Sequence, residues 1–173
     1  TDPYAIPAEV KNDCTLTVIR EYADQNAIPT DVVDAVTPLT AKGIFNGNGE
    51  GNFAADDTLT MDQMSVILAR VCGADLTAVD GASAAACGEC AGWAAPAVAW
   101  LVEKGIYTYG PDSAYLGFAV YGNEGLTNDL TALTQYLELD VDVAALVDGI
   151  GLEADAYVTR GQMAVILAQL LGL

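Results

Sequence analysis

Histidine is absent from the 173 residues of this chain. Its absence excludes Ser-His-Asp and Cys-His catalysis, imidazole metal ligands and the usual proton shuttle. Basic residues are scarce as well: six Lys and Arg stand against 24 Asp and Glu, for a formal net charge of −18. Such a surface repels phosphate backbones and anionic membranes, so the composition argues against nucleic-acid binding.

A long, strongly apolar run is also missing. The nearest candidate, 82–102, is mostly Ala and Gly and contains Glu89 and Pro96, which makes it too weak for a transmembrane span. We therefore expect no membrane insertion. Aromatic residues make up only 8% of a chain that is 53% hydrophobic and rich in Ala. That mixture favours packed helices over a β-sandwich and predicts an all-α fold.

Only four cysteines are present: Cys14, Cys72, Cys87 and Cys90. An even number is typical of an oxidising compartment, so we expect disulfides in a secreted protein. Of the three possible pairings we favour Cys87–Cys90, which closes a very small loop, with Cys14–Cys72 joining distant elements. A thioredoxin-like motif would need a preceding strand, and a zinc site would need two close pairs, so we expect no metal and no cofactor.

What the chain does contain is an internal repeat. Residues 60–73 and 159–172 are identical at eight of fourteen positions. Each copy opens with a Thr suited to the N-cap and ends with a Gly suited to the position after a helix. Apolar residues recur between them at helical spacing, which predicts two copies of one amphipathic helix. A weaker third copy is 126–139, opening at Thr127.

A second unit precedes the first. Residues 35–44 and 97–106 both end in Lys-Gly-Ile, which predicts a helix stopped by glycine and followed by a buried Ile. Residues 143–150 form a shorter copy. The loop 46–53 is rich in Gly and Asn and ends on an aromatic residue. Its oxygen side chains alternate as in an EF-hand, but the first place is Asn46 and the twelfth is Asp57, so we interpret it as a structural turn.

The ordered set resembles the S-layer homology family, whose repeats combine a Trp-Ala start, a helix ending near Gly-Ile, a Gly-rich loop with an aromatic residue, and a second helix opening with Thr-Arg. The matching segments here are Trp93-Ala94, Lys104-Gly105-Ile106, Lys42-Gly43-Ile44, Gly49–Phe53, Leu59–Gln63 and Val158–Gln162. The resemblance implies an all-α domain in which three helix-loop-helix repeats pack as a bundle about a pseudo-threefold axis.

On this basis residues 1–173 form a single domain. It comprises an N-terminal helical segment 1–30, repeat one 31–73, an Ala/Gly/Cys-rich linker 74–91, repeat two 92–139 and a compressed repeat three 140–173. We expect a shared core from the apolar stripes of the second helices: Met64, Ile67, Leu68, Val71, Leu130, Leu133, Met163, Ile166, Leu167 and Leu170.

The resemblance also implies a non-catalytic module that holds a protein on the bacterial cell surface by binding cell-wall polysaccharide, often an anionic polymer with pyruvylated sugars. Such a site would use an arginine for the carboxylate, the start of a helix, and a Trp face for a sugar ring. The residues that fit these roles are Arg160, Thr159, Trp93, Trp100 and Thr60.

Arg160 alone keeps the family's Thr-Arg placement, because the equivalent positions hold Met61 and Asn128. Arg20 and Arg70 follow no helix-opening Thr, so we expect them to contribute little. With one such arginine in an acidic chain, the alternative is a protein–protein interaction or surface-assembly module that kept the fold but lost glycan binding. A carboxylate-based glycosidase is a third class, but no motif singles out a pair of acids. An Arg160 that shared a groove with a tryptophan would favour glycan binding.

Overall fold

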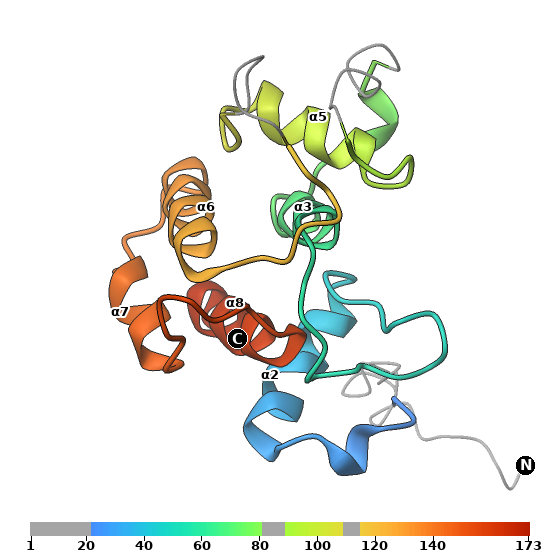
Figure 1. The fold of residues 1–173 in the computed structure, drawn as a ribbon, viewed down its shortest axis with the longest axis vertical. Coiled ribbons are helices and arrows are strands. Elements are labelled where there is room, and N and C mark those ends of the chain that lie inside the picture. The colour runs from blue at the N-terminus through green and yellow to red at the C-terminus, as the bar shows by residue number, and fades with distance from the viewer. Residues whose placement is uncertain (1–21, 81–88, 109–114) are drawn as a thin grey trace, which may run out of the picture.

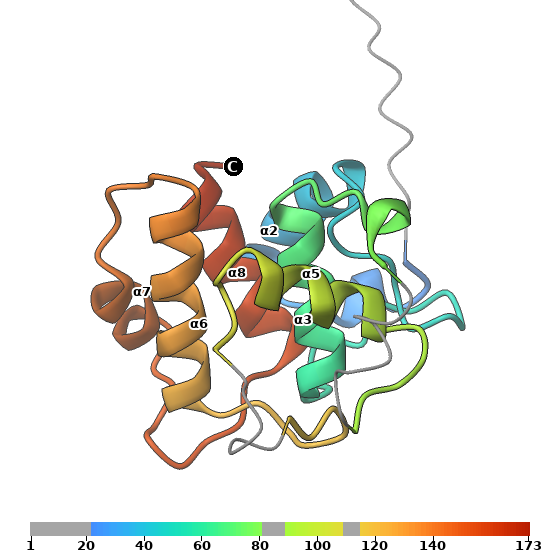
Figure 2. The same cartoon turned by 90° about the horizontal axis from the view of Figure 1, so that it is seen from above.

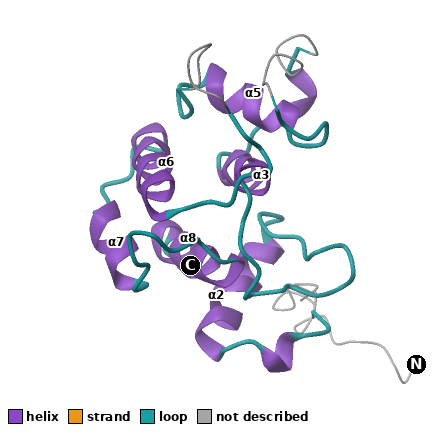
Figure 3. Ribbon diagram, viewed as in Figure 1, coloured by secondary structure: helices purple, strands orange, loops and turns teal. Residues whose placement is uncertain are grey.

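The computed structural model describes residues 22–80, 89–108 and 115–173 (Figure 1). Within these ranges the regular structure is helical, with isolated bridges but no strand (Figure 3). The α-helices are α2 (Thr30–Ala41), α3 (Met61–Val71), α5 (Ala95–Glu103), α6 (Asn123–Tyr136), α7 (Val143–Gly149) and α8 (Arg160–Leu171). Two short 3-10 helices are η1 (Gln25–Ala27) and η2 (Leu76–Ala78). The predicted all-α class is confirmed.

The two repeated helices begin where the sequence predicts. Thr60 is the N-cap of α3: its Oγ1 accepts a hydrogen bond from Gln63 N at 3.3 Å, and Gln63 Oε1 accepts one from Thr60 N at 3.1 Å. Thr159 and Gln162 form the same capping box on α8, at 3.2 and 3.0 Å. Both helix starts are therefore set by a local side-chain signal.

The predicted start of the third copy at Thr127 is wrong. Helix α6 begins at Asn123, after the extended N-cap residue Gly122. Thr127 lies inside the helix, where its hydroxyl donates to Asn123 O at 3.0 Å. Gly122 has no side chain with which to cap the helix, so contacts from other parts of the chain fix this start. The residue of α6 that corresponds to Arg160 is consequently Asn123, not Asn128.

The segments that lead into α3, α6 and α8 are joined by a closed ring of backbone hydrogen bonds. Leu59 N donates to Val158 O at 2.9 Å, Val158 N to Tyr121 O at 2.8 Å, and Tyr121 N to Leu59 O at 2.9 Å. All three side chains are buried. In Figure 1 the three helices lie around this centre. The ring therefore holds the starts of the three helices close together.

Helix packing runs across the predicted repeat boundaries. The pairs in contact across these boundaries are α3 with α5, α6 with α7, and α8 with α2, and each pair lies side by side in Figure 1. Within repeat three, α7 also contacts α8. Each repeated helix thus packs on the first helix of the following unit, and α8 returns to the first helix of the chain. No unit covers its apolar faces by itself, which ties the start of the described chain to its end.

Most of the predicted core is buried, including Met64, Leu130, Met163 and Ile166, but Val71 lies only half-buried at its edge. Cys72 carries a free, half-buried thiol, so the predicted Cys14–Cys72 bridge is wrong. Burial raises the pKa of this thiol to about 11.

Cys14, Cys87 and most of the predicted N-terminal segment lie outside the described residues. From residue 22 onwards that segment contributes the short η1 and packs on the Gly-rich loop, where Ala23 N donates to Gly51 O at 2.9 Å. Across the described ranges, no helix has both the length and the apolar character needed to cross a membrane.

Candidate functional site

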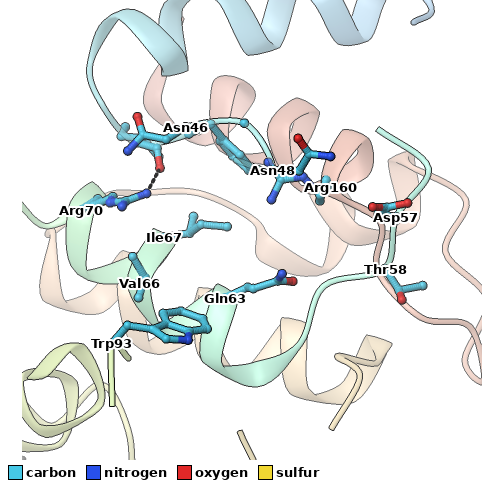
Figure 4. A pocket seen from close by; sticks show the side chains of 13 residues that line it. Asn46, Asn48, Asp57, Thr58, Gln63, Val66, Ile67, Arg70, Trp93 and Arg160 are labelled. Atoms are coloured by element: carbon cyan, nitrogen blue, oxygen red, sulfur yellow. Dashed lines mark hydrogen bonds between the residues drawn. The ribbon is translucent and has the colours of Figure 1, made fainter. Parts of the chain in front are cut away.

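A pocket of about 300 Å³ opens between the loop 44–58 and α3. Asn46 and Asn48 stand on the loop wall, and Gln63 and Val66 on the helix wall (Figure 4). Trp93, from the turn before α5, lies beside the helix wall. The pocket therefore combines the loop 44–58 and the helix that follows it with Trp93, which comes from a later segment.

Arg160 reaches this pocket from the first position of α8. Its side chain is only 8% exposed, and its Nε donates to Phe53 O at 2.7 Å. The guanidinium carbon lies 5.0 Å from the ring centroid of Phe53 and 5.6 Å from that of Phe45. These cation–π contacts and the backbone bond from Arg160 N to Asp57 O, at 2.9 Å, hold the loop 44–58 against α8.

The Arg160 guanidinium is not fully satisfied. Its Nη2 atom is buried and finds no hydrogen-bond partner among the residues that the structure describes. Burial lowers the pKa of Arg160, partly offset by Tyr22, Asp57 and Asp24, but an arginine stays charged in a protein. A buried charged donor without a partner costs at least about 1–3 kcal/mol. An acceptor that reached Nη2 would recover part of this cost.

Arg70 supplies a second cation, which the sequence analysis expected to contribute little. It lies on the α3 wall, largely exposed, and its Nη1 donates to Ile44 O at 3.3 Å (Figure 4). Two of the four Lys and Arg residues in the described ranges thus line one pocket; the other two are Lys42 and Lys104. No local motif marks Arg70, because its place depends on how α3 packs beneath the loop.

The other predicted site residues divide into two groups. Trp93 is 61% exposed and shares the pocket with Arg160. Trp100 is buried in the core, edge-on to Tyr136 with ring centroids 5.8 Å apart, and does not line the pocket. The hydroxyls of Thr159 and Thr60 are occupied in the helix caps and lie outside the pocket lining. Of the five, the structure brings together Arg160 and Trp93.

The loop wall is held by carboxylate and amide groups. Asp24 accepts hydrogen bonds from Phe53 N and Ala54 N, both at 2.8 Å. Burial opposes ionisation of Asp24, but these backbone donors, with a smaller contribution from Arg160, outweigh it and lower its pKa. Asn48 Oδ1 accepts from Glu50 N and Asn52 N at 3.0 and 3.2 Å. The Gly-rich loop is thus a structural turn that presents a pre-formed wall.

The corresponding loop after α5 carries different chemistry. There Asp62 of α3 is buried, and its carboxylate accepts from Tyr115 Oη at 2.9 Å and from Ala91 N at 2.8 Å. Ser65 Oγ is hydrogen-bonded to the Tyr115 and Tyr107 hydroxyls at 2.9 and 3.1 Å. We call these four side chains, Asp62, Ser65, Tyr107 and Tyr115, the Asp62 network. It is an acidic, hydrogen-bonded cluster in place of a cationic pocket.

Comparison with known families gives one match. Residues 21–64, which include α2, the loop that forms one wall of the pocket and the start of α3, match the model described as the S-layer homology domain. No curated protein matches the chain.

Proposed function

Because the chain carries an S-layer homology domain, a non-catalytic module for cell-wall anchoring, we propose that it holds a protein at the bacterial surface by binding an acidic cell-wall polysaccharide in the pocket between the loop 44–58 and α3. The ligand is a glycan whose sugars carry carboxylates, such as pyruvyl groups. This role requires export of the protein.

The observation that carries the proposal is the meeting of Arg160, Arg70 and Trp93 in one pocket. A guanidinium recognises a carboxylate through paired N–H donors, and an exposed indole provides an apolar face for a sugar ring. The neighbouring amides of Asn46 and Gln63 can donate to and accept from sugar hydroxyls. In a chain with net charge −18, a pocket with two cations and a single acid, Asp57, is a local exception that suits an anion.

We further propose that the fold is a pseudo-threefold arrangement of repeats 31–73, 92–139 and 140–173. The ring formed by Leu59, Tyr121 and Val158 supports this, because each donates to one partner and accepts from the other. In this arrangement Met61 and Asn123 occupy the positions equivalent to Arg160. Hence a single glycan site, at Arg160, is expected per chain.

The proposal is tested by titrating the purified chain with cell-wall polymer and with the same polymer after mild acid removal of its pyruvyl groups, followed by calorimetry. We expect saturable binding to the first and at least about a tenfold loss with the second, since the charged hydrogen bonds to arginine are lost. Equal binding to both polymers would contradict recognition of the carboxylate. Binding to neither would favour the protein-interaction alternative.

A further inference from the structure

A second exposed aromatic surface shares no residue with the pocket. Phe118 is 69% exposed, Tyr157 54% and Val120 41%. Phe118 and Val120 belong to the segment that leads into α6, and Tyr157 to the segment that leads into α8. In Figure 2 both segments run along the lower edge of the molecule. Three large apolar side chains therefore face solvent at one end of the fold.

The bridges place these side chains on one face. Val120 is paired with Thr60, and Gly122 with Tyr157, both antiparallel. Side chains alternate along an extended segment, so Val120 and Tyr157 point outward while Tyr121 and Val158 point into the core. Gly122 adds no side chain between them, and the space there is open, with Ala156 O the nearest atom to a Cβ built on Gly122, at 3.8 Å. Gly122, which pairs with Tyr157, thus adds no side chain to this face.

Exposed carboxylates lie within two residues of Gly122 and of Tyr157, whereas Arg160, three residues after Tyr157, is buried. Glu124 follows Gly122, and Asp155 precedes Tyr157 on the paired segment. Glu89, also exposed, is joined to the segment before Phe118, because its carbonyl accepts from Gly117 N at 2.8 Å. Between Lys104 and Arg160 the sequence has no Lys or Arg but nine Asp and Glu. Among the described residues the ion pair is Lys104 with Glu103, so none of these three carboxylates is neutralised.

We propose that this surface, defined by Phe118, Val120, Tyr157, Glu89, Glu124 and Asp155 and called here the Tyr157 surface, binds a protein segment that presents Lys or Arg beside apolar side chains. The aromatic faces attract a cation and its aliphatic stem, and the carboxylates steer it and pair with it. The same negative charge disfavours an acidic glycan, a nucleic acid or an anionic lipid. The proposal does not depend on glycan binding at Arg160, because the two surfaces share no residue.

The test uses short fluorescent peptides with alternating Arg and Leu, and matched peptides with Glu in place of Arg, in anisotropy titrations. We expect the Arg peptide to bind the parent chain and the Glu peptide not to bind. The variant Phe118→Ser with Tyr157→Ser, which leaves the net charge unchanged, should lower the affinity at least about tenfold. Trp93→Ser is the matched control and should bind as the parent does. Circular dichroism verifies that each variant keeps its helices.

A second pair of variants separates this surface from the overall charge. Glu124→Gln with Asp155→Asn should weaken peptide binding several-fold more than Asp31→Asn with Asp34→Asn, which removes two exposed charges from α2. Equal losses in the two pairs, or an unchanged affinity in the Phe118 and Tyr157 variant, would show attraction by net charge alone and overturn the proposal. A loss of wall-polymer binding in that variant would also overturn it, because the surface would then be part of a glycan site.

Discussion

The two loops that precede repeated helices share a backbone frame, but the helix starts that pack on them carry opposite charge, Arg160 on α8 and Asp62 on α3. At the pocket, Arg160 N donates to Asp57 O and Gly161 N to Ala55 O, both at 2.9 Å. At the Asp62 network, Met61 N donates to Ala119 O at 2.9 Å and Asp62 N to Gly117 O at 3.0 Å. The first two residues after each N-cap therefore occupy equivalent places, yet one pair is Arg-Gly and the other Met-Asp.

The difference shows that two side-chain positions decide the chemistry of each loop. At Gly161 an added Cβ would lie 3.1 Å from Ala55 O, which is tighter than an ordinary contact, so the loop leaves little room there for a side chain. At Asp62 the helix carries the large side chain and the loop supplies the glycine, because a Cβ on Gly117 would overlap the Asp62 carboxyl group. At each contact either the helix or the loop carries a side chain, but not both. At α8 the helix has Gly161 and the neighbouring Arg160 reaches Phe53. At α3 the loop has Gly117 and the helix buries the Asp62 carboxylate.

Disrupting the Asp62 network should have the largest effect on stability. Gly117→Ala would displace the Asp62 carboxylate from Tyr115 and Ala91, and we expect a loss of about 3 kcal/mol in the free energy of unfolding from overpacking and lost hydrogen bonds. Urea unfolding measures it. Gly149→Ala is the control, because its Cβ would meet no atom within 4 Å and should leave stability unchanged or slightly raised. Equal stability of the two variants would refute the steric argument.

Removing the Arg160 guanidinium from the pocket should lower both polymer binding and stability. Arg160→Ala removes the bond to Phe53 O and the contacts with two rings, so we expect about 2 kcal/mol lower stability. We also expect a loss of about 1.5–3 kcal/mol in polymer affinity. Arg160→Lys should recover only part of both, since a point charge lacks the planar fork. Calorimetry and urea unfolding measure the two effects. An unchanged polymer affinity in folded Arg160→Ala would exclude Arg160 from the glycan site.

The stability of the fold should also depend on pH through Asp129, which is hydrogen-bonded to Tyr107 of the Asp62 network. Burial raises the pKa of Asp129 to about 6, although the Tyr121 and Tyr107 hydroxyls bond to it and oppose the rise. Because the folded-state pKa lies above the unfolded value, this group stabilises the fold fully below about pH 4, and the contribution is lost as pH rises through 6.

The parent should therefore lose about 2 kcal/mol of stability between pH 4 and pH 7 relative to Asp129→Asn, whose amide stays neutral. Urea unfolding of both chains across this range measures the difference. A difference in unfolding free energy between the two chains that does not change with pH would mean that the pKa of Asp129 is not raised in the folded state.

The smallest expected effect is that of Arg70, and it tests whether this residue contributes to the pocket by direct contact with the polymer. Arg70 is exposed and makes one bond at 3.3 Å, so Arg70→Ala should cost polymer affinity by about 1 kcal/mol while stability changes by less than about 0.5 kcal/mol. Lys42→Ala removes the same charge outside the pocket and is the control. A loss of affinity in both variants to the same degree would assign the effect to net charge instead of contact.

Sequence patterns predicted the helical class and the repeated helices because their signals are local. The Thr60 and Thr159 caps, each with a Gln three residues later, mark the starts of α3 and α8 within their own segments. Helix α6 has no such cap, so the prediction began it at Thr127, whereas the ring bonds of Tyr121 start it at Asn123. A boundary set by long-range bonds leaves no mark in its own segment.

For the candidate site, the sequence by itself determined that Arg160 opens a helix and that cations are rare in an acidic chain. Only the tertiary structure decided that Trp93 lines the pocket while Trp100 is buried, and that Arg70 joins Arg160 across it. The physical reason is that periodicity states which residues share a helix face, but the neighbour that covers the face is chosen by packing between distant segments. In this chain that packing brings α8 back to α2 and sets the loop 44–58 over α3.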